Sequence, residues 1–346
     1  MKHQTTRYGE IPFYKIGTFG NTADAFISKK LFLEYKTKYS FPKKGDILIS
    51  ASGTIGRAVI YDGKPAYFQD SNIVWIDNDE TLVKNDFLFY AYSNVKWNTE
   101  YTTILRLYND NFRNTLIPLP PLNEQSAIAN ILSTLDRYLC ALDALILKKE
   151  SVKKALSFEL LSQRKRLKGF NQAWQRVRLG DIANYLTSNL SAEQITQQGK
   201  IKVYDVNNFI GYTDTTFISD KPYISIVKDG SVGRVRILPP KTNILSTMGA
   251  LIANHRTTTE FLFYLLSNFD FKNFTSGSII PHIYFKDYKE KTIFLPPLNE
   301  QSAIANILSD LDNEIASLKN KKRQFENIKK ALNHDLMSAK IRVLEK

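Results

Sequence analysis

Two short glycine-rich segments carry the side chains best suited to contact a polyanion. SGTIGRAVI occupies residues 52–60 and DGSVGRVRI occupies residues 229–237. Each places two glycines around a hydroxyl residue, and glycine lets backbone N–H groups approach a phosphate closely. Arg57 and Arg234 end these runs and could hold a phosphate or read a guanine edge with two hydrogen bonds. A hairpin turn with an exposed arginine explains the same pattern equally well.

A second pair of matched segments also differs in its polar side chains. YTTILRLY at residues 101–108 faces GSIIPHIY at residues 277–284, which sets Arg106 against His282. One scaffold position with a changed polar residue is expected of two readers of different base pairs, although surface drift fits equally well. The candidate DNA contacts are Ser52, Thr54, Arg57 and Arg106 in the first half and Lys228, Ser231, Arg234, Ser278 and His282 in the second.

Signals of catalysis are weak. The sequence has no methyltransferase (N/D)PP(Y/F) motif, no GxGxxG and no GxxxxGK(S/T), so neither nucleotide cradle is predicted. The histidines stand alone, which predicts no metal site. Asp24, Glu34 and Lys36 loosely resemble the acidic pattern of metal-dependent nucleases, but a charged surface loop is the favoured interpretation. We expect no catalytic residue, metal or cofactor in this chain.

Charge favours a nucleic-acid partner. The chain has 47 Lys and Arg against 34 Asp and Glu, a net charge of +13. An excess of this size favours a polyanion.

No apolar run approaches the ~18 residues of a membrane span, and the first residues lack a signal-peptide core, so we expect a cytoplasmic protein. The single cysteine, Cys140, is expected to be a small buried residue of a helix.

An internal repeat organises the chain. Residues 119–133 and residues 295–309 both read LPPLNEQSAIANILS, 176 residues apart. Weaker echoes lie at nearly the same offset, such as NDFLFYAYSN at 85–94 and TEFLFYLLSN at 259–268. Between these anchors the halves differ almost everywhere. The sequence therefore predicts two copies of one scaffold with different surfaces.

Each repeated motif is predicted to open a long helix. Prolines precede both motifs, and Asn123 and Asn299 are suitable N-caps. Neither helix has Pro or Gly over about 40–45 residues, or ~60–68 Å. Apolar residues at steps of three and four predict a coiled-coil seam, and an antiparallel pair is its simplest form, although each helix could instead pair with another protein. The seam is Ile128, Leu132, Leu135, Leu139, Leu142, Ile304, Leu308, Leu311, Ile315 and Leu318, with Ile131, Leu145, Val152 and Ile328 as further members.

Short β-prone runs broken by Gly, Asn and Asp fill the rest of the chain, with helices near 87–96 and 260–269. The predicted fold is α+β, with two strand-rich domains joined by two long helices in a pseudo-twofold arrangement. The predicted divisions are residues 1–118, 119–170, 171–294 and 295–346.

The doubled LPPLNEQ, its long helix and the WQRVRLGDI that opens the second domain resemble the specificity subunit of type I restriction–modification systems. The resemblance covers nearly the whole chain. It implies two target recognition domains, each reading one half of a split site in double-stranded DNA. It also implies a scaffold for two modification (methyltransferase) subunits, with restriction subunits bound through them and no active site in this chain. A coiled-coil adaptor that does not read DNA, or a stand-alone nuclease, are the alternatives.

The two domains depart from each other at the front. The second has 25 residues, 174–198, before its GKIKVY segment, whereas the first has eight before GEIPFY, so about 17 residues of the repeat are absent. The first domain is therefore predicted to be shortened, or to borrow its edge element from elsewhere.

Overall fold

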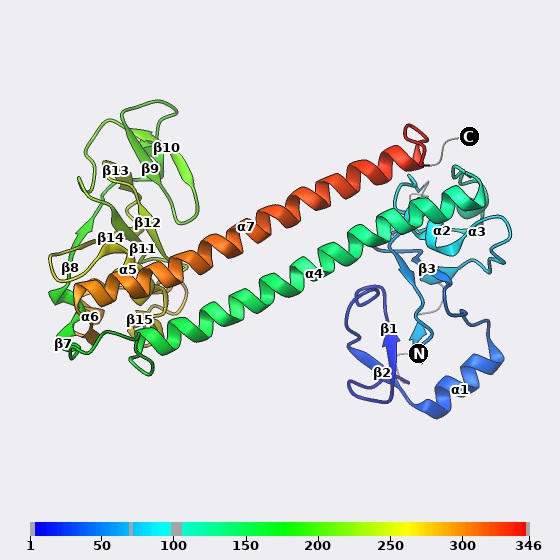
Figure 1. Cartoon of the computed structure of the whole chain (residues 1–346), viewed down its shortest axis with the longest axis horizontal. Coiled ribbons are helices and arrows are strands. Elements are labelled where there is room, and N and C mark those ends of the chain that lie inside the picture. Colours follow the sequence, from blue (N-terminus) through cyan, green and yellow to red (C-terminus); the bar gives the residue numbers. More distant parts are fainter. Residues whose placement is uncertain (1–3, 69–71, 98–105, 344–346) are drawn as a thin grey trace. The chain divides into compact units, whose positions relative to one another are not determined.

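A computed structural model describes residues 4–68, 72–97 and 106–343 (Figure 1). The chain divides into two compact units. The first unit holds residues 1–143 and 320–346, and the second unit holds residues 144–319. Each of the two long helices contributes one part to each unit. The predicted α+β class, with two strand-rich domains and two long helices, is confirmed.

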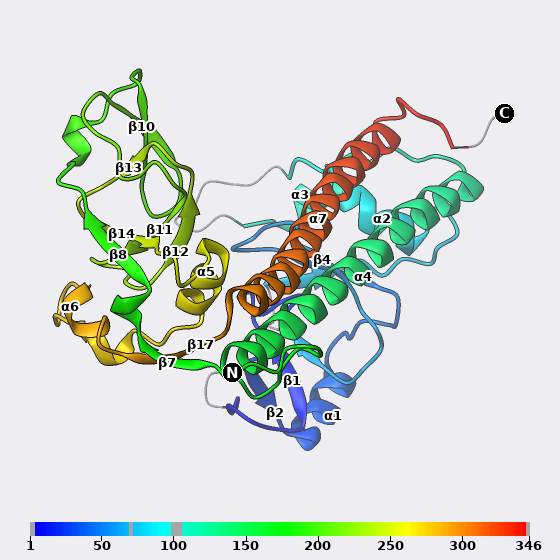
Figure 2. The same ribbon diagram turned by 60° about the vertical axis from the view of Figure 1, so that its left-hand side comes forward.

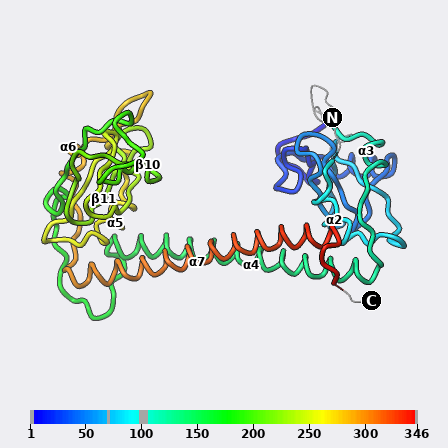
Figure 3. The backbone as a smooth tube through the Cα atoms, turned by 90° about the horizontal axis from the view of Figure 1, so that it is seen from above, coloured from blue at the N-terminus to red at the C-terminus, as the bar shows by residue number. Residues whose placement is uncertain are grey.

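The long helices are α4 (Leu122–Leu161) and α7 (Leu298–Met337), each of 40 residues (Figure 3). The backbone N–H of Gln125 donates to the Pro121 carbonyl at 2.9 Å, and Gln301 does the same to Pro297. Both helices thus begin ahead of Asn123 and Asn299, whose side chains accept from the next backbone N–H instead. The predicted asparagine N-caps are wrong.

In the first unit the two helices run antiparallel. Lys322 pairs with Asp143 at 2.7 Å and Lys329 pairs with Asp136, so partners descend along one helix as they rise along the other. In the second unit Lys149 pairs with Glu314 at 2.8 Å and Lys153 pairs with Asp312, so the helices run in the same antiparallel sense there. The predicted antiparallel pair is confirmed within each unit.

Burial along the seam follows most of the prediction. Ile128, Leu132, Leu142, Ile304, Leu308 and Ile315 are buried, and Leu135, Leu139, Leu311 and Leu318 are half-buried. The prediction is wrong at four further seam members and at the cysteine, because the contact stripe is narrower than the apolar pattern. The exposed residues are Ile131, Leu145, Val152, Ile328 and Cys140.

The second unit contains a four-stranded sheet in the order β12-β11-β14-β8 and a three-stranded sheet β10-β9-β13, with β7 paired to β17 and β15 to β16 (Figure 2). Strand β11 reads YISIV and is buried throughout, as a central strand requires. Helix α5 (Thr259–Ser267), capped by Thr258, packs on this sheet. The strands are β7 (Gln175–Arg178), β8 (Ala183–Thr187), β9 (Ile201–Tyr204), β10 (Phe209–Thr213), β11 (Tyr223–Val227), β12 (Val235–Leu238), β13 (Thr242–Ile244), β14 (Met248–Ala253), β15 (Thr275–Ser276), β16 (His282–Ile283) and β17 (Thr292–Leu295). The short helices are η1 (Leu179–Asp181), η2 (Ala192–Gln194), η3 (Lys272–Phe274) and α6 (Phe285–Tyr288).

The first unit repeats this topology in part. Its sheets, β4-β3-β6 and β2-β1-β5, match β12-β11-β14 and β10-β9-β13. Among the described residues, β7 and β8 have no counterpart in the first unit. The strands are β1 (Ile11–Tyr14), β2 (Ala25–Ile27), β3 (Ile47–Ser50), β4 (Ala58–Ile60), β5 (Tyr67–Phe68) and β6 (Ile73–Trp75). The helices are α1 (Lys29–Lys38), α2 (Asn85–Tyr92) and α3 (Asn109–Arg113).

The repeated motif attaches each strand-rich domain to the helix pair. The Gln125 side chain accepts from the Lys84 N–H at 2.8 Å and donates to the Leu82 carbonyl at 3.0 Å. Gln301 accepts from the Thr258 N–H at 3.0 Å and donates to the Arg256 carbonyl at 2.9 Å. Because buried amides must be satisfied, these side chains hold the segment before α2 and α5 in place.

A tyrosine completes each attachment. Tyr90 of α2 donates to Asp136 of α4 at 2.7 Å, and Lys329 of α7 pairs with the same carboxylate and lies over the tyrosine ring. Burial and the bond to Asp136 raise the pKa of Tyr90, so the phenol stays a donor. The second unit repeats the triad with Tyr264, Asp312 and Lys153.

We expect Leu132→Ala to destabilise the first unit by about 2–5 kcal/mol, because Leu132 is fully buried between α2 and the helix pair. Leu147→Ala is the matched control on the same helix, because Leu147 is 64% exposed, and should cost less than about 0.5 kcal/mol. Urea unfolding followed by circular dichroism measures both. Equal losses for the two variants would contradict the seam.

The Glu124–Arg342 pair, which links the start of α4 to the segment after α7, predicts a pH effect. Its hydrogen bonds hold the pKa of Glu124 below its usual value. The pair therefore stabilises the folded chain at neutral pH, and this contribution is lost as the pH falls through the lowered pKa. We expect Arg342→Gln to lower the melting temperature at pH 7 and to lose less than the parent between pH 7 and pH 3. An unchanged pH profile would contradict this role.

Candidate nucleic-acid interface

Two matched turns form the centre of the candidate interface. One connects β3 to β4 and the other connects β11 to β12. Gly56 and Gly233 hold the same place in these turns, both with φ near +80°. A Cβ on Gly56 would lie 2.2 Å from the Trp97 ring nitrogen, and one on Gly233 would lie 2.6 Å from the Phe271 ring. Turn conformation and ring packing therefore account for these two glycines without a phosphate.

In each unit the second matched segment meets this turn. Ser52 forms an antiparallel bridge with Arg106, and Asp229 forms one with His282. The adjoining hydrogen bonds also correspond, from the Leu107 N–H to the Ala51 carbonyl at 2.8 Å, and from Ile283 to Lys228 at 2.9 Å. Two sequence regions singled out separately thus form one surface in each unit. Residues 101–105 of the first segment lie outside the described residues.

The second unit carries a histidine on this surface. His282 Nδ1 lies 2.6 Å from Asp229 Oδ1, and Lys228 Nζ lies 3.4 Å from the other oxygen of that carboxylate. The His282 side chain is 35% exposed. If Nδ1–H donates to Asp229, the tautomer leaves Nε2 as an acceptor. Such a ring could accept from a base amino group.

Two arginines of the second unit, Arg234 and Arg236, are both hydrogen-bonded to Asn207. Arg234 donates to the Asn207 side chain at 2.7 Å, and Arg236 donates to the Asn207 carbonyl at 2.9 Å while stacking on Tyr204. Arg234 remains exposed, as do Ser231 and Ser278. Because a guanidinium has five donors, Arg234 keeps donors for a ligand while Asn207 fixes its direction. Asn207 was not predicted, because it lies in the β9–β10 turn, far away in sequence.

The first unit presents different side chains at its matched turn and bridge. Arg57 donates to the Phe19 carbonyl at 3.1 Å, and Arg57, Thr54 and Arg106 are exposed. Ser52 is only 2% exposed and donates to Asn72, just before β6, at 2.7 Å, so its hydroxyl is buried and already has a partner. The exposed side of this surface therefore offers two arginines where the second unit offers Arg234 and His282.

Two residues of the nuclease alternative, Asp24 and Lys36, each contact other side chains and not one another. Asp24 pairs with Lys15 at 2.9 Å, and Lys36 lies over the rings of Phe32 and Phe41. The described residues contain no group of three His, Cys, Asp or Glu side chains that could hold a metal ion. None of the helices in the described part of the chain has the length and apolar character to cross a bilayer.

Comparison with known proteins identifies the family. Residues 1–150 and 171–327 match the family described as type I restriction modification DNA specificity domain. A type I restriction enzyme specificity subunit of Haemophilus influenzae is 65% identical over 133 residues, covering 38% of this chain and 34% of that protein. The chain thus spans about a third of this relative's length. The MjaVIII specificity subunit of Methanocaldococcus jannaschii is 26% identical over 92% of this chain and 84% of its own length.

Solved structures agree in fold. The S subunit of a type I restriction–modification system from M. genitalium matches with a TM-score of 0.64 and 21% identity, over 97% of this chain and 91% of that one. A chain of a type I restriction–modification complex matches with a TM-score of 0.53 and 16% identity, over 85% and 82%. The profile match covers well over half of the chain, and so this protein belongs to the family of type I restriction–modification DNA specificity subunits.

Proposed function

We propose that each unit reads one half of a bipartite site in double-stranded DNA. One observation carries this proposal. The two units keep the same turn and the same bridge to a second segment, yet they present Arg57 with Arg106 in one case and Arg234 with His282 in the other. A duplication retained only for structure has no need to vary the exposed polar residues at a matched bridge.

The side chains suit this task. An arginine can donate two hydrogen bonds to a guanine edge in the major groove, and a histidine offers a different pattern. Surrounding cations, from a net charge of +13, would hold phosphates and fix the orientation. Each unit alone should bind weakly, and linking two on one chain raises affinity through effective concentration.

The partners we propose are two modification (methyltransferase) subunits, with restriction subunits joining through them. Support comes from the repeated helix starts, which expose identical side chains on successive turns of one face, as a partner bound twice would require. These are Leu122, Ser126 and Asn130, and Leu298, Ser302 and Asn306. The chain itself would be non-catalytic, without a cofactor, and would act in the cytoplasm. Neither the adaptor nor the nuclease alternative has an observation in its favour.

We expect Arg234→Ala and His282→Ala to relax recognition of one half-site only, and Arg57→Ala and Arg106→Ala to relax the other. Loss of one good base contact is worth about 1–3 kcal/mol of discrimination, or roughly tenfold and more. Long-read mapping of methylated motifs in a host with this chain and its modification subunits is the measurement.

Arg323→Ala, on the exposed side of α7, is the control and should leave both half-sites unchanged. If one substitution in the second unit altered both halves, or if all four left the motif unchanged, the two-reader proposal would be wrong.

A further inference from the structure

Two neighbouring isoleucines stand exposed at the end of a β-ribbon in the second unit. Strands β15 and β16 form a two-stranded antiparallel sheet of their own, and residues 277–281 connect them. In this connection Ile279 is 93% exposed and Ile280 is 54% exposed. Glycine and polar residues usually fill such turns. Single exposed apolar residues are common on proteins, so the surroundings of this pair decide its role.

The tip of the ribbon is held in place. Ile283, at its base, is buried in the core of the second unit. The Gly230 N–H donates to the Pro281 carbonyl at 2.8 Å, which ties the tip to the turn between β11 and β12. Gly277 has a φ of +92°, and a Cβ there would lie 2.2 Å from the Ile280 carbonyl oxygen, so this bend requires glycine. Because the loop is braced and isoleucine is stiff about χ1, holding the tip against a ligand costs little conformational entropy.

Polar and charged groups surround the tip. His282 follows Pro281 directly, and Lys228 and Arg234 lie on either side of the turn to which the tip is bonded. Asp229 is already paired with His282 and Lys228. An apolar groove of another protein would have to bury these groups as well, which is costly. A DNA duplex instead offers phosphates for the cations and, in the major groove, the 5-methyl group of thymine for an apolar side chain.

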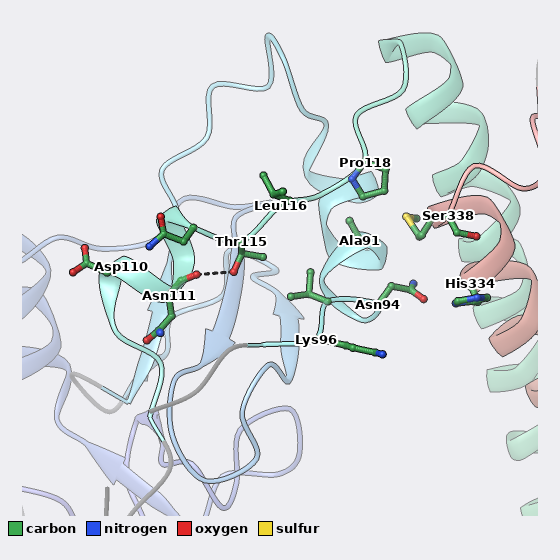
Figure 4. Close-up of a pocket in the computed structure, with 13 residues that line it drawn as sticks. Ala91, Asn94, Lys96, Asp110, Asn111, Thr115, Leu116, Pro118, His334 and Ser338 are labelled. Carbon is green, nitrogen blue, oxygen red and sulfur yellow. Dashed lines mark hydrogen bonds between the residues drawn. The ribbon is translucent and has the colours of Figure 1, made fainter. Parts of the chain in front are cut away.

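The shape of the ribbon suits the same ligand, because the major groove is wide enough to admit a two-stranded β-ribbon. A cavity of about 650 Å³ in the first unit does not suit it. Figure 4 shows this cavity, which is lined by residues such as Asn94, Asn111 and His334 and by none of residues 52–57 or Arg106. Base edges lie inside a groove, so an element that protrudes from a reading surface reaches them better than a hollow away from that surface.

We propose that Ile279 reads the 5-methyl group of a thymine in the half-site of the second unit. This inference rests on the proposed half-site reading and adds to it the chemical group that the tip selects. The half-site of the second unit therefore contains an A·T pair beside the pairs contacted by Arg234 and His282. The matched residue of the first unit, Thr103, lies outside the described residues, so the proposal concerns the second unit alone.

The test uses the full chain with its modification subunits and fluorescent duplexes that carry the methylated motif. The half-site of the second unit is the one that Arg234→Ala relaxes. Each thymine of that half-site, on either strand, is replaced in turn by deoxyuridine, which removes only the methyl group. We expect one position at which the Kd rises about fourfold, the value of one buried methyl group. At that position Ile279→Ala should bind the thymine and deoxyuridine duplexes equally.

Val152→Ala is the matched control, because it trims another exposed β-branched residue, on α4. It should keep the fourfold difference between the two duplexes. The melting temperature of Ile279→Ala should equal that of the parent, since the side chain is almost fully exposed in the absence of DNA.

Three results would overturn the proposal. The first is equal binding of the parent chain to thymine and deoxyuridine duplexes at every position, and the second is an unchanged difference in Ile279→Ala. The third is loss of modification-subunit binding by Ile279→Ala, which would assign the tip to a protein contact. If Arg234→Ala relaxed one half-site while deoxyuridine had no effect, half-site reading would stand and the methyl contact alone would fail.

Discussion

Each long helix carries one apolar stripe along 40 residues, and a helix of this kind needs a partner along its length. The two copies of the helix meet that need for each other, because an antiparallel arrangement sets the start of each against the end of the other. Glu124 meets Arg342 in the first unit and Glu300 meets Arg166 in the second. The strand-rich domains then depend on this pair, since the repeated glutamines and the Tyr–Asp–Lys triads attach them to it.

This arrangement separates the residues that are identical in the two units from the exposed residues that differ between them. The glutamines of the identical motif contact backbone groups, so this part of the attachment works whatever the domain reads. The exposed residues at the matched turns lie far from the attachment in sequence, and can change without disturbing it.

Much of the fold was predictable because its signals are local or repeated. The fifteen-residue repeat and the absence of Pro and Gly predicted both helices, and the common offset predicted that the segments holding Arg106 and His282 share one place. Helix starts were less predictable. The Pro121 carbonyl already accepts the first helical bond, which leaves Asn123 inside the first turn. Ile131 and Cys140 are exposed because a two-helix seam covers a narrower stripe than a globular core does.

Long-range polar contacts could not be predicted. Asn207 orients Arg234 from a turn 27 residues away, and Asp229 meets His282 across 53 residues. No spacing in the sequence marks such pairs, because only the folded sheet brings them together. The partners of Glu124 and Glu300 have the same origin, since each lies on or beside the other long helix.

The proposal that each unit reads one half-site implies that the helix pair sets the gap between the half-sites, because both helices run from one unit into the other. Its most direct test inserts seven residues in register into both helices at the boundary of the units, after Asp143 and before Asn320. Each helix would lengthen by ~10.5 Å, or ~3 base pairs at about 3.4 Å each. Methylation mapping should then find both half-sites unchanged and the gap between them wider by a few base pairs. An unchanged gap, with both half-sites still methylated, would contradict the account.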